Sequence, residues 1–147
     1  MDKLHHYIAS RLETNYFISH MGLTLSKVAP MEADIDVEVQ KHHLQQNGFT
    51  HGGVIATLCD VATGIAAYTA APEGKNVVTA DLKISYLNPS TAPLVRAKGR
   101  VKKAGKLLFF CEAEVFDILE DGEKLVATAT AIMVAVDIPL SKDASTR

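Results

Sequence analysis

The sequence contains little of what marks several large classes of protein. It has two cysteines, no tryptophan and 6% aromatic residues among 147, and its formal net charge is −2. Cys59 and Cys111 lie far apart in apolar surroundings, so we expect buried free thiols in a reducing compartment rather than a disulfide framework or a zinc site. The nearly balanced charge offers no bulk electrostatic attraction to nucleic acid or to an acidic membrane, so neither is expected as a partner.

Long apolar runs are also missing. The N-terminal stretch lacks the unbroken apolar segment of a signal peptide, and no segment reaches the roughly 18 apolar residues that a membrane-spanning helix needs. We therefore expect a cytoplasmic protein with no membrane insertion. The adjacent pairs His5–His6 and His42–His43 lack metal-ligand spacing and are expected at the surface, so we predict no metal site.

The length of the chain suits one domain, over residues 1–147, with one substantial core. Apolar residues recur at helical spacing over residues 3–19, which predicts a helical N-terminal segment over about residues 1–20. The polar end of the chain, about residues 138–147, predicts a flexible tail. Residues 53–70 are apolar nearly all round, which is typical of a buried helix.

Alternating patterns predict strands on both sides of this helix. Residues 22–40 should form two strands, the second with apolar residues on one face and acids on the other. Further strands are expected at residues 76–87, 94–103, 106–118 and 125–136. In the first of these, one face would carry Val78, Ala80, Leu82, Ile84 and Tyr86. Together these elements predict an α+β fold, an antiparallel β-sheet wrapped around a long central helix.

Two glycines mark the start of the predicted helix. The first N–H groups of a helix have no partners inside the helix, and the helix dipole makes this end partly positive. Gly52 and Gly53 have no Cβ, so a carbonyl oxygen or a small anion can approach those N–H groups closely. The pair is therefore a candidate oxyanion hole. The competing interpretation is steric, because two glycines also permit a tight turn into the helix.

An acidic residue interrupts the same helix. Lone carboxylates are rarely buried without a partner or a function, and Asp60 lies two turns into an otherwise apolar segment. Thr57 and Thr63 flank it at i−3 and i+3, which makes a narrow polar stripe. Asp60 is therefore either a functional acid, or an acid that is hydrogen-bonded to one of these threonines or faces solvent.

The spacing between these two features limits how they can cooperate. Gly52 and Asp60 are eight residues apart, which is roughly 12 Å along a helix at about 1.5 Å per residue. Proton transfer or attack needs about 3 Å, so a carbonyl held at Gly52 lies out of reach of Asp60 in the same chain. If both act on one atom, they must belong to different subunits. A two-fold dimer with antiparallel helices would form two such sites.

The stretch LQQNGFTHGGVIATLCDVATG, residues 44–64, resembles the helix-entry motif of the hotdog-fold acyl-CoA thioesterases of the phenylacetic-acid-degradation (PaaI) type. The family pattern is an Asn or Gln, a short polar stretch with glycine, His-Gly-Gly, and then an acid eight residues after the first glycine. These positions are occupied by Gln45, His51, Gly52 and Asp60. The later stretch VVTADLKISYLNPS resembles the strand after the helix, and the resemblance extends over about residues 20–136.

The resemblance implies a hotdog fold, a homodimer with active sites at the subunit interface that often pairs into a tetramer, and an acyl-CoA substrate with no separate cofactor. It also implies roles for single residues. The Gly52 N–H would polarise the thioester carbonyl, and Gln45 would orient that carbonyl or the attacking water. Asp60 of the facing subunit would be the nucleophile or the general base. Thr79, early in the next strand, would help to place the water.

Candidates for substrate binding lie in and near the same motif. His51 would either contact substrate or cap the helix, and Thr63 would replace a hydroxyl that some relatives carry at the position of Gly64. Further candidates are Asn47 and Gly53. The acyl group would lie along the helix near Val54, Leu58 and Val61.

Basic residues that could bind the phosphates of coenzyme A follow one face of the strand at 94–103. With a three-residue hairpin loop, Arg96 would lie opposite Glu114 and Lys98 opposite Glu112, as ordinary cross-strand pairs. We therefore expect Arg96 and Lys98 to be structural. The phosphate contacts are expected nearer the turn, at Arg100, Lys102, Lys103 and Lys106.

Hydrolysis of an acyl-CoA thioester is the leading hypothesis, and three alternatives compete with it. A hydroxyacyl-thioester dehydratase on the same fold typically has a His-Phe-Pro setting, which this chain lacks. A non-catalytic acyl-CoA-binding domain, or a purely structural dimer, would have no use for Asp60.

Overall fold

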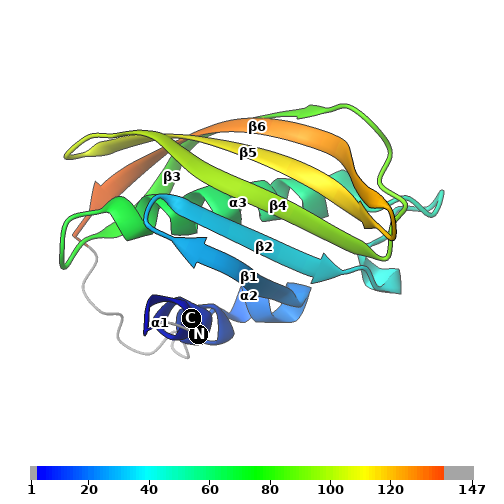
Figure 1. The fold of residues 1–147 in the computed structure, drawn as a ribbon, viewed down its shortest axis with the longest axis horizontal. Coiled ribbons are helices and arrows are strands. Elements are labelled where there is room, and N and C mark those ends of the chain that lie inside the picture. Colours follow the sequence, from blue (N-terminus) through cyan, green and yellow to red (C-terminus); the bar gives the residue numbers. More distant parts are fainter. Residues whose placement is uncertain (1–2, 138–147) are drawn as a thin grey trace.

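A central helix and one curved sheet organise the fold (Figure 1). The computed structural model describes residues 3–137, so the predicted tail at about 138–147 lies outside the described residues. The elements are α1 (Lys3–Glu13), α2 (Tyr16–Met21), β1 (Leu23–Ala29), β2 (Glu32–Glu38), the 3-10 turn η1 (Lys41–His43), α3 (Gly52–Ala70), β3 (Asn76–Tyr86), β4 (Leu94–Ala104), β5 (Leu108–Leu119) and β6 (Gly122–Val136). All neighbouring strands are antiparallel, in the order β1-β2-β4-β5-β6-β3. The predicted architecture is confirmed, with small shifts at the ends of the elements.

The sheet buries α3 against its concave face. Leu58 of α3 is fully buried beside Ile35 and Val115 of the sheet, and the C-terminal half of α3 packs against Phe109. By length and composition α3 would also suffice to cross a membrane, but half of that stretch is buried inside the protein. Apolar character on nearly every side is what a core helix needs.

The N-terminal segment forms two helices, where one was predicted over residues 3–19. Asn15 separates them, because its side-chain oxygen accepts a 3.2 Å hydrogen bond from the Ile18 N–H and caps α2. Gly22, with a φ of 68°, ends α2 in the left-handed conformation that glycine favours. Leu12 and Ile18 are buried in the same core cluster as α3, so α1 and α2 are joined to the main body of the fold.

A β-bulge in β3 changes which side chains face α3. The pairing with β6 shifts by one residue between Thr79 and Asp81, so Ala80 is an extra residue without a partner on β6. Thr79 consequently points toward α3, where its hydroxyl reaches Asp60. Strict alternation along the strand would place Thr79 on the opposite face.

The same bulge corrects the predicted inner face of this strand. Leu82 and Ile84 pack against the core as predicted. Val78 lies before the bulge and does not share that face, since it is 42% exposed while its neighbour Val77 packs inward. The prediction that Val78 and Ala80 share one face with Leu82 is therefore wrong.

A second irregularity sets the register of β4 against β5. The pairing shifts between Val101 and Lys103, close to the hairpin, so the register assumed for a three-residue loop is wrong. The observed pairs are Arg96 with Phe116, Lys98 with Glu114 and Arg100 with Glu112. The faces of β4 are as predicted, because basic side chains still alternate with buried apolar ones.

Gly99 lets β4 lie directly against the middle of α3. A Cβ at this position would come within 2.4 Å of the Ala62 carbonyl carbon and 2.8 Å of the Thr63 nitrogen. Both are backbone atoms of α3, so they cannot give way as a flexible side chain would. The contact between helix and sheet therefore depends on the missing side chain.

We predict that Gly99→Ala lowers the free energy of unfolding by about 2–3 kcal/mol, because the added methyl forces β4 away from α3. Gly64→Ala is the matched control, since a Cβ at Gly64 meets no atom within 4 Å. Alanine also favours a helix over glycine by up to about 1 kcal/mol. Chemical denaturation measures both variants, and equal stabilities would contradict the close packing at Gly99.

Candidate active site

Asp60 lies on α3 beside a cavity of about 250 Å³. The Thr79 hydroxyl donates a hydrogen bond of 2.5 Å to Asp60 Oδ1. In residues 3–137, Oδ2 of the same carboxylate has no hydrogen-bond partner. One carboxylate oxygen is therefore held in place, and the other is left for chemistry.

The threonines on α3 do not serve this carboxylate. Thr57 donates to the Gly53 carbonyl at 2.8 Å, and Thr63 donates to the carbonyls of Cys59 and Asp60 at 2.7 and 3.2 Å. Such contacts return the hydroxyl to the helix backbone. Thr63 is fully buried, so it does not reach the cavity, contrary to its predicted contact with substrate. The alternative of Asp60 as an acid bonded to these hydroxyls is also wrong.

The thiol next to Asp60 is not a competing nucleophile. Cys59 and Cys111 are both buried free thiols, as predicted. Burial, followed by the nearby charge of Asp60, raises the pKa of the Cys59 thiol to about 12. The thiol therefore stays protonated at neutral pH, and the thiolate is the reactive form. Within residues 3–137, no three His, Cys, Asp or Glu side chains converge as metal ligands.

The cavity beside Asp60 is not quite the predicted acyl pocket. Val54 and Leu58 are buried in the core, so only Val61 of the three predicted residues lines it. The cavity extends instead along α3 to Gly64 and Tyr68, and residues of α1 and α2 form its outer wall. The N-terminal helices thus contribute to the site, which sequence reasoning missed.

His51 caps the N-terminus of α3. Its Nδ1 accepts a 2.9 Å hydrogen bond from the Gly53 N–H. Of the two alternatives for His51, the structure therefore shows the helix cap. The Gly53 N–H was predicted to contact substrate, but it is already hydrogen-bonded to His51. In residues 3–137, the Gly52 N–H has no hydrogen-bond partner. One N–H at the positive end of the helix dipole is left open at Gly52.

Gln45 lines the same cavity as Gly52, a space of about 310 Å³. Its Oε1 accepts a 2.5 Å hydrogen bond from the backbone N–H of Asn47. This contact orients the side-chain amide and leaves its Nε2 group without a hydrogen-bond partner in the described part of the chain. Asn47 therefore positions Gln45 through its backbone N–H. Its side chain is exposed and does not line the cavity, although it was predicted to contact substrate.

Buried polar contacts hold the loop that leads into α3. Asp117 is 1% exposed, and its carboxylate accepts a 2.5 Å hydrogen bond from the Ser90 hydroxyl and two more from the backbone N–H groups of Thr91 and Ala92. The Ser90 hydroxyl also lies 3.1 Å from the Thr50 hydroxyl. Thr50 is two residues before Gly52, so this network helps to fix the helix N-terminus. No pattern in the sequence singled out Ser90 or Asp117.

Asp60 and Gly52 lie beside separate cavities. The cavity beside Asp60 and the cavity beside Gly52 have no lining residue in common. Their spacing on α3, roughly 12 Å, agrees with this separation. Asp60 and Gly52 of one chain therefore do not face a common cavity.

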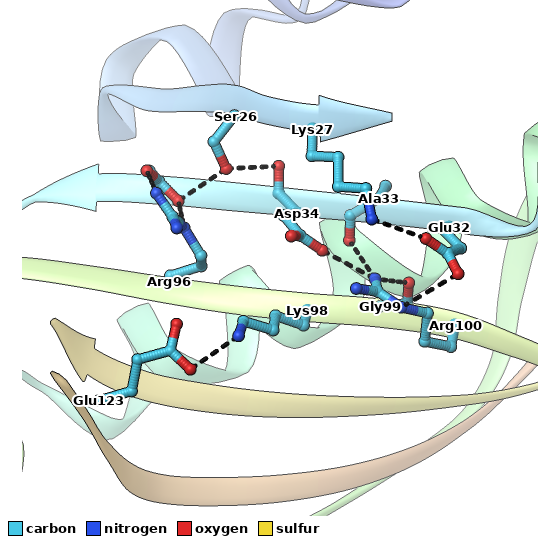
Figure 2. Close-up of polar contacts among 11 residues, drawn as sticks. Ser26, Lys27, Glu32, Ala33, Asp34, Arg96, Lys98, Gly99, Arg100 and Glu123 are labelled. Carbon is cyan, nitrogen blue, oxygen red and sulfur yellow. Dashed lines mark hydrogen bonds and ion pairs between the residues drawn. The ribbon is translucent and has the colours of Figure 1, made fainter. Parts of the chain in front are cut away.

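The basic face of β4 forms an ion-pair network on the outer face of the sheet (Figure 2). Arg96 makes two 2.7 Å hydrogen bonds to the Asp36 carboxylate. Arg100 makes a single 2.7 Å hydrogen bond from Nη1 to Asp34 Oδ1. Arg96 is structural, as predicted, although its partner lies on β2 rather than β5. Arg100 is structural too, rather than the predicted phosphate ligand.

The remaining lysines of this region divide into two groups. Ion pairs join Lys98 to Glu123 and Lys102 to Glu112. Lys103 and Lys106 are exposed, and neither has an ion-pair partner among residues 3–137. Their hairpin lies at the C-terminal end of α3, away from Gly52 of the same chain (Figure 1).

Comparison with known proteins identifies the family. Residues 47–131 match the sequence profile of the Thioesterase superfamily. The chain belongs to the thioesterase superfamily. Acyl-coenzyme A thioesterase 13 of Mus musculus is 28% identical to this thioesterase over 94 residues, which are 63% of this chain and 66% of the mouse protein. The chain is accordingly a thioester hydrolase.

Solved structures share the fold of this thioesterase. A thioesterase family protein from Silicibacter pomeroyi superposes with a TM-score of 0.83 at 25% identity, covering 91% of this chain and 96% of that one. The PaaI protein of E. coli, from the phenylacetic acid degradation operon, gives a TM-score of 0.78 at 20% identity, again over 91% of this chain and 96% of its own. The PaaI protein of Thermus thermophilus, at 29% identity, gives a TM-score of 0.70 over 80% of this chain and 96% of its own. The hotdog fold and the PaaI-type resemblance are confirmed.

His43 anchors the loop before α3 in this thioesterase and is buried, not at the surface as predicted. It is 1% exposed, its Nδ1 accepts a 2.9 Å hydrogen bond from the Gln40 N–H, and its Nε2 lies 2.9 Å from the Met21 carbonyl. These contacts fit a neutral ring with its proton on Nε2. Its backbone carbonyl accepts a 2.8 Å hydrogen bond from the His51 N–H. Burial lowers the pKa of His43.

This pKa shift predicts an acid-sensitive fold. A histidine whose pKa is lowered by folding takes up its proton more readily in the unfolded chain, so its contribution to stability is present above the ordinary pKa of about 6.5. As the pH falls below that value, we expect the free energy of unfolding to decrease by up to about 1.4 kcal/mol per pH unit from this residue. Denaturation of His43→Gln between pH 7.5 and 5 should show a shallower pH dependence than the wild type.

His6→Gln is the control, because His6 is exposed and should leave the pH dependence unchanged. If the free energy of unfolding depends on pH identically in the wild type and in His43→Gln, His43 is not the cause of the acid sensitivity.

Proposed function

We propose that this thioesterase hydrolyses acyl-CoA to a free acid and coenzyme A, at sites shared between two subunits of a homodimer. The mouse relative is named an acyl-coenzyme A thioesterase. The observation that carries the proposal is the state of the Asp60 carboxylate. Thr79 holds its Oδ1 at 2.5 Å, and its Oδ2 has no hydrogen-bond partner in residues 3–137. A carboxylate oriented in this way beside a cavity is suited to attack or proton transfer.

The Gly52 N–H would receive the thioester carbonyl oxygen. Negative charge develops on that oxygen as the carbonyl carbon is attacked, and an N–H at a helix N-terminus stabilises this charge. The Nε2 group of Gln45 is a second donor in the same cavity, and it would orient the carbonyl or the attacking water. Collapse of the tetrahedral intermediate then breaks the C–S bond and releases the thiol of coenzyme A.

Asp60 of the facing subunit would act on the same carbonyl carbon. As a general base it takes a proton from the attacking water and later returns it to the leaving sulfur. As a nucleophile it forms an acyl-enzyme anhydride, which water then hydrolyses. Both roles need one unoccupied carboxylate oxygen, which Oδ2 offers. Thr79 acts as a positioning residue, because its hydroxyl contacts the carboxylate itself.

The exposed strand β3 supports the dimer. It is 11 residues long, it forms one edge of the sheet, and most of it is exposed. An exposed edge of this length is a template for pairing with another strand. Two β3 strands paired antiparallel about a two-fold axis would set the two α3 helices side by side in opposite directions. Each Asp60 would then approach Gly52 of the other subunit, and a tetramer would need a second interface.

The same arrangement would place the coenzyme A end of the substrate near the hairpin between β4 and β5. Lys103 and Lys106 lie toward the C-terminal end of α3, which in an antiparallel pair is the end nearer the partner's Gly52. Their ammonium groups have no ion-pair partner in residues 3–137, so we include them in the proposal as phosphate ligands. The buried free thiols support a reducing, cytoplasmic location.

Removing the free carboxylate oxygen tests the reaction itself. Release of thiol from a panel of acyl-CoAs should fall about 10²–10⁴-fold in Asp60→Asn and Asp60→Ala, because both lose the base or nucleophile. Asp121→Asn is the control, since Asp121 is an exposed carboxylate in the turn between β5 and β6 and lines neither cavity. Undiminished release in both Asp60 variants would take Asp60 out of the mechanism. A wild-type protein that releases no thiol from any acyl-CoA would instead be a binding domain.

The role of the Gly52 N–H can be tested without disturbing the helix. Proline is well tolerated at the first helical position, where its missing N–H has no helical partner. His51 has φ −62° and ψ 138°, the extended conformation that a residue before proline prefers. We expect Gly52→Pro to lower kcat about 10²–10³-fold, the cost of losing one oxyanion donor.

Gly52→Ala is the matched variant, because it keeps the N–H and its Cβ would lie 3.4 Å from the Tyr86 ring, an ordinary contact. Equal activities of the proline and alanine variants would rule out the N–H as the oxyanion donor.

A further inference from the structure

The cavity beside Asp60 is polar at both ends. Asp60 and Thr79 lie at one end, and Arg11, Tyr68 and Asn76 line the other. Asp60 and Tyr68 are eight residues apart on one face of α3, roughly 12 Å along the helix. Across the cavity, Thr79 and Asn76 are three residues apart on β3, about 10 Å at 3.3 Å per residue. Along either wall, the two polar ends are therefore roughly 10–12 Å apart.

The wall between the two ends is apolar. Its side chains come from α1, α2, α3, β3 and β6, and include Leu12, Ile18, Val61, Ile65, Val77 and Met133. Gly64 lies midway between Asp60 and Tyr68, and no atom lies within 4 Å of where its Cβ would be. A hydrocarbon chain that starts at Asp60 would therefore pass along an apolar wall with room beside Gly64.

The far end is organised around the guanidinium of Arg11. Its Nη2 donates a 3.0 Å hydrogen bond to the Asn76 Oδ1, and its Nη1 lies 3.5 Å from the Tyr7 hydroxyl. The guanidinium carbon is 4.7 Å from the centre of the Tyr68 ring, a cation–π contact. The Tyr7 and Tyr68 hydroxyls are 3.0 Å apart. All of these partners of Arg11 are uncharged, so none of them neutralises the positive charge of its guanidinium.

Arg11 differs in this respect from the other described arginines. Arg96 and Arg100 on the outer face are paired with Asp36 and Asp34. In residues 3–137, Arg11 has no carboxylate within ion-pair distance. An arginine fork with unused donors binds a carboxylate in bidentate fashion.

We propose that Arg11 selects acyl groups that carry a carboxylate at the far end of their chain. The substrates would be mono-CoA thioesters of medium-length dicarboxylic acids, and this inference rests on the proposed hydrolysis at Asp60. An extended chain advances about 1.3 Å per C–C bond of about 1.5 Å, so a cavity of roughly 10–12 Å matches about eight carbons. The thioester carbonyl would lie near Asp60, the methylene chain along the apolar wall, and the carboxylate at Arg11.

A matched pair of substrates tests this selection. The octanedioic acid mono-CoA thioester and octanoyl-CoA differ only in the terminal carboxylate. We expect the wild type to favour the first by at least about tenfold in kcat/KM, the effect of one charge-assisted bidentate contact. Arg11→Met should abolish this ratio, and Arg11→Lys, which keeps the charge but loses the fork, should retain part of it. Thermal melts confirm that each variant is folded.

Lys75→Met is the control for a general loss of positive charge. Lys75 lies next to Asn76 in sequence but is paired with Asp137 at 2.7 Å and does not line the cavity, so the ratio should stay at the wild-type value. A wild type without preference for the carboxylated substrate, or a ratio that survives in Arg11→Met, would overturn the proposal.

Binding of the free acids separates this proposal from the proposed hydrolysis. Calorimetry should show that octanedioate binds more tightly than octanoate, and that Arg11→Met removes the difference. If both thioesters stay intact while this binding preference is present, the hydrolysis is wrong and the anion site is right. If both thioesters are cleaved at equal rates and the acids bind equally, the hydrolysis stands and the role of Arg11 is refuted.

Discussion

The distance along α3 between Gly52 and Asp60 is the constraint on which the proposed active site depends. Gly52 opens α3 and Asp60 lies two turns later, and the sheet buries the helix so that neither can shift relative to the other. About 12 Å therefore separates an N–H that can hold a carbonyl oxygen from the carboxylate that would act on the same carbonyl. No rotation of a side chain closes that gap. In the proposed mechanism, a chain with these two groups therefore completes a site only with a second copy of itself.

Departures from regular structure place the groups that matter. The extra residue at Ala80 turns Thr79 toward Asp60. His51 uses its ring to occupy one of the two glycine N–H groups, and so leaves the other one open. Gly99 allows the sheet to lie against the helix backbone. The apolar core supplies most of the burial, but these few local features determine which atoms face the cavities.

Periodicity in the sequence was sufficient for the fold. The alternation in β2 and β4 and the all-round apolar character of α3 report burial directly, and each element lies close to its predicted position. The motif around Gly52 and Asp60 led to two residues that both line cavities, and their catalytic roles stay predictions. The strand register could not be predicted where a β-bulge occurs. One unpaired residue is not visible in the composition, yet it reverses which side chains of the strand face the core. Partners that are distant in sequence could not be predicted either. The residues around Arg100 do not indicate its ion pair with Asp34, and those around His43 do not indicate its hydrogen bond with Met21.

The most direct test of the central claim is a subunit-mixing experiment with two chains that are each defective in one half of the site. Asp60→Asn chains keep Gly52, and Gly52→Pro chains keep Asp60. If the halves belong to different subunits, a heterodimer contains one intact site. Random co-refolding of equal amounts then makes half of the dimers heterodimers, so thiol release should recover to about one quarter of the wild-type rate. A mixture no more active than the average of its two components would show that each site is built within a single chain.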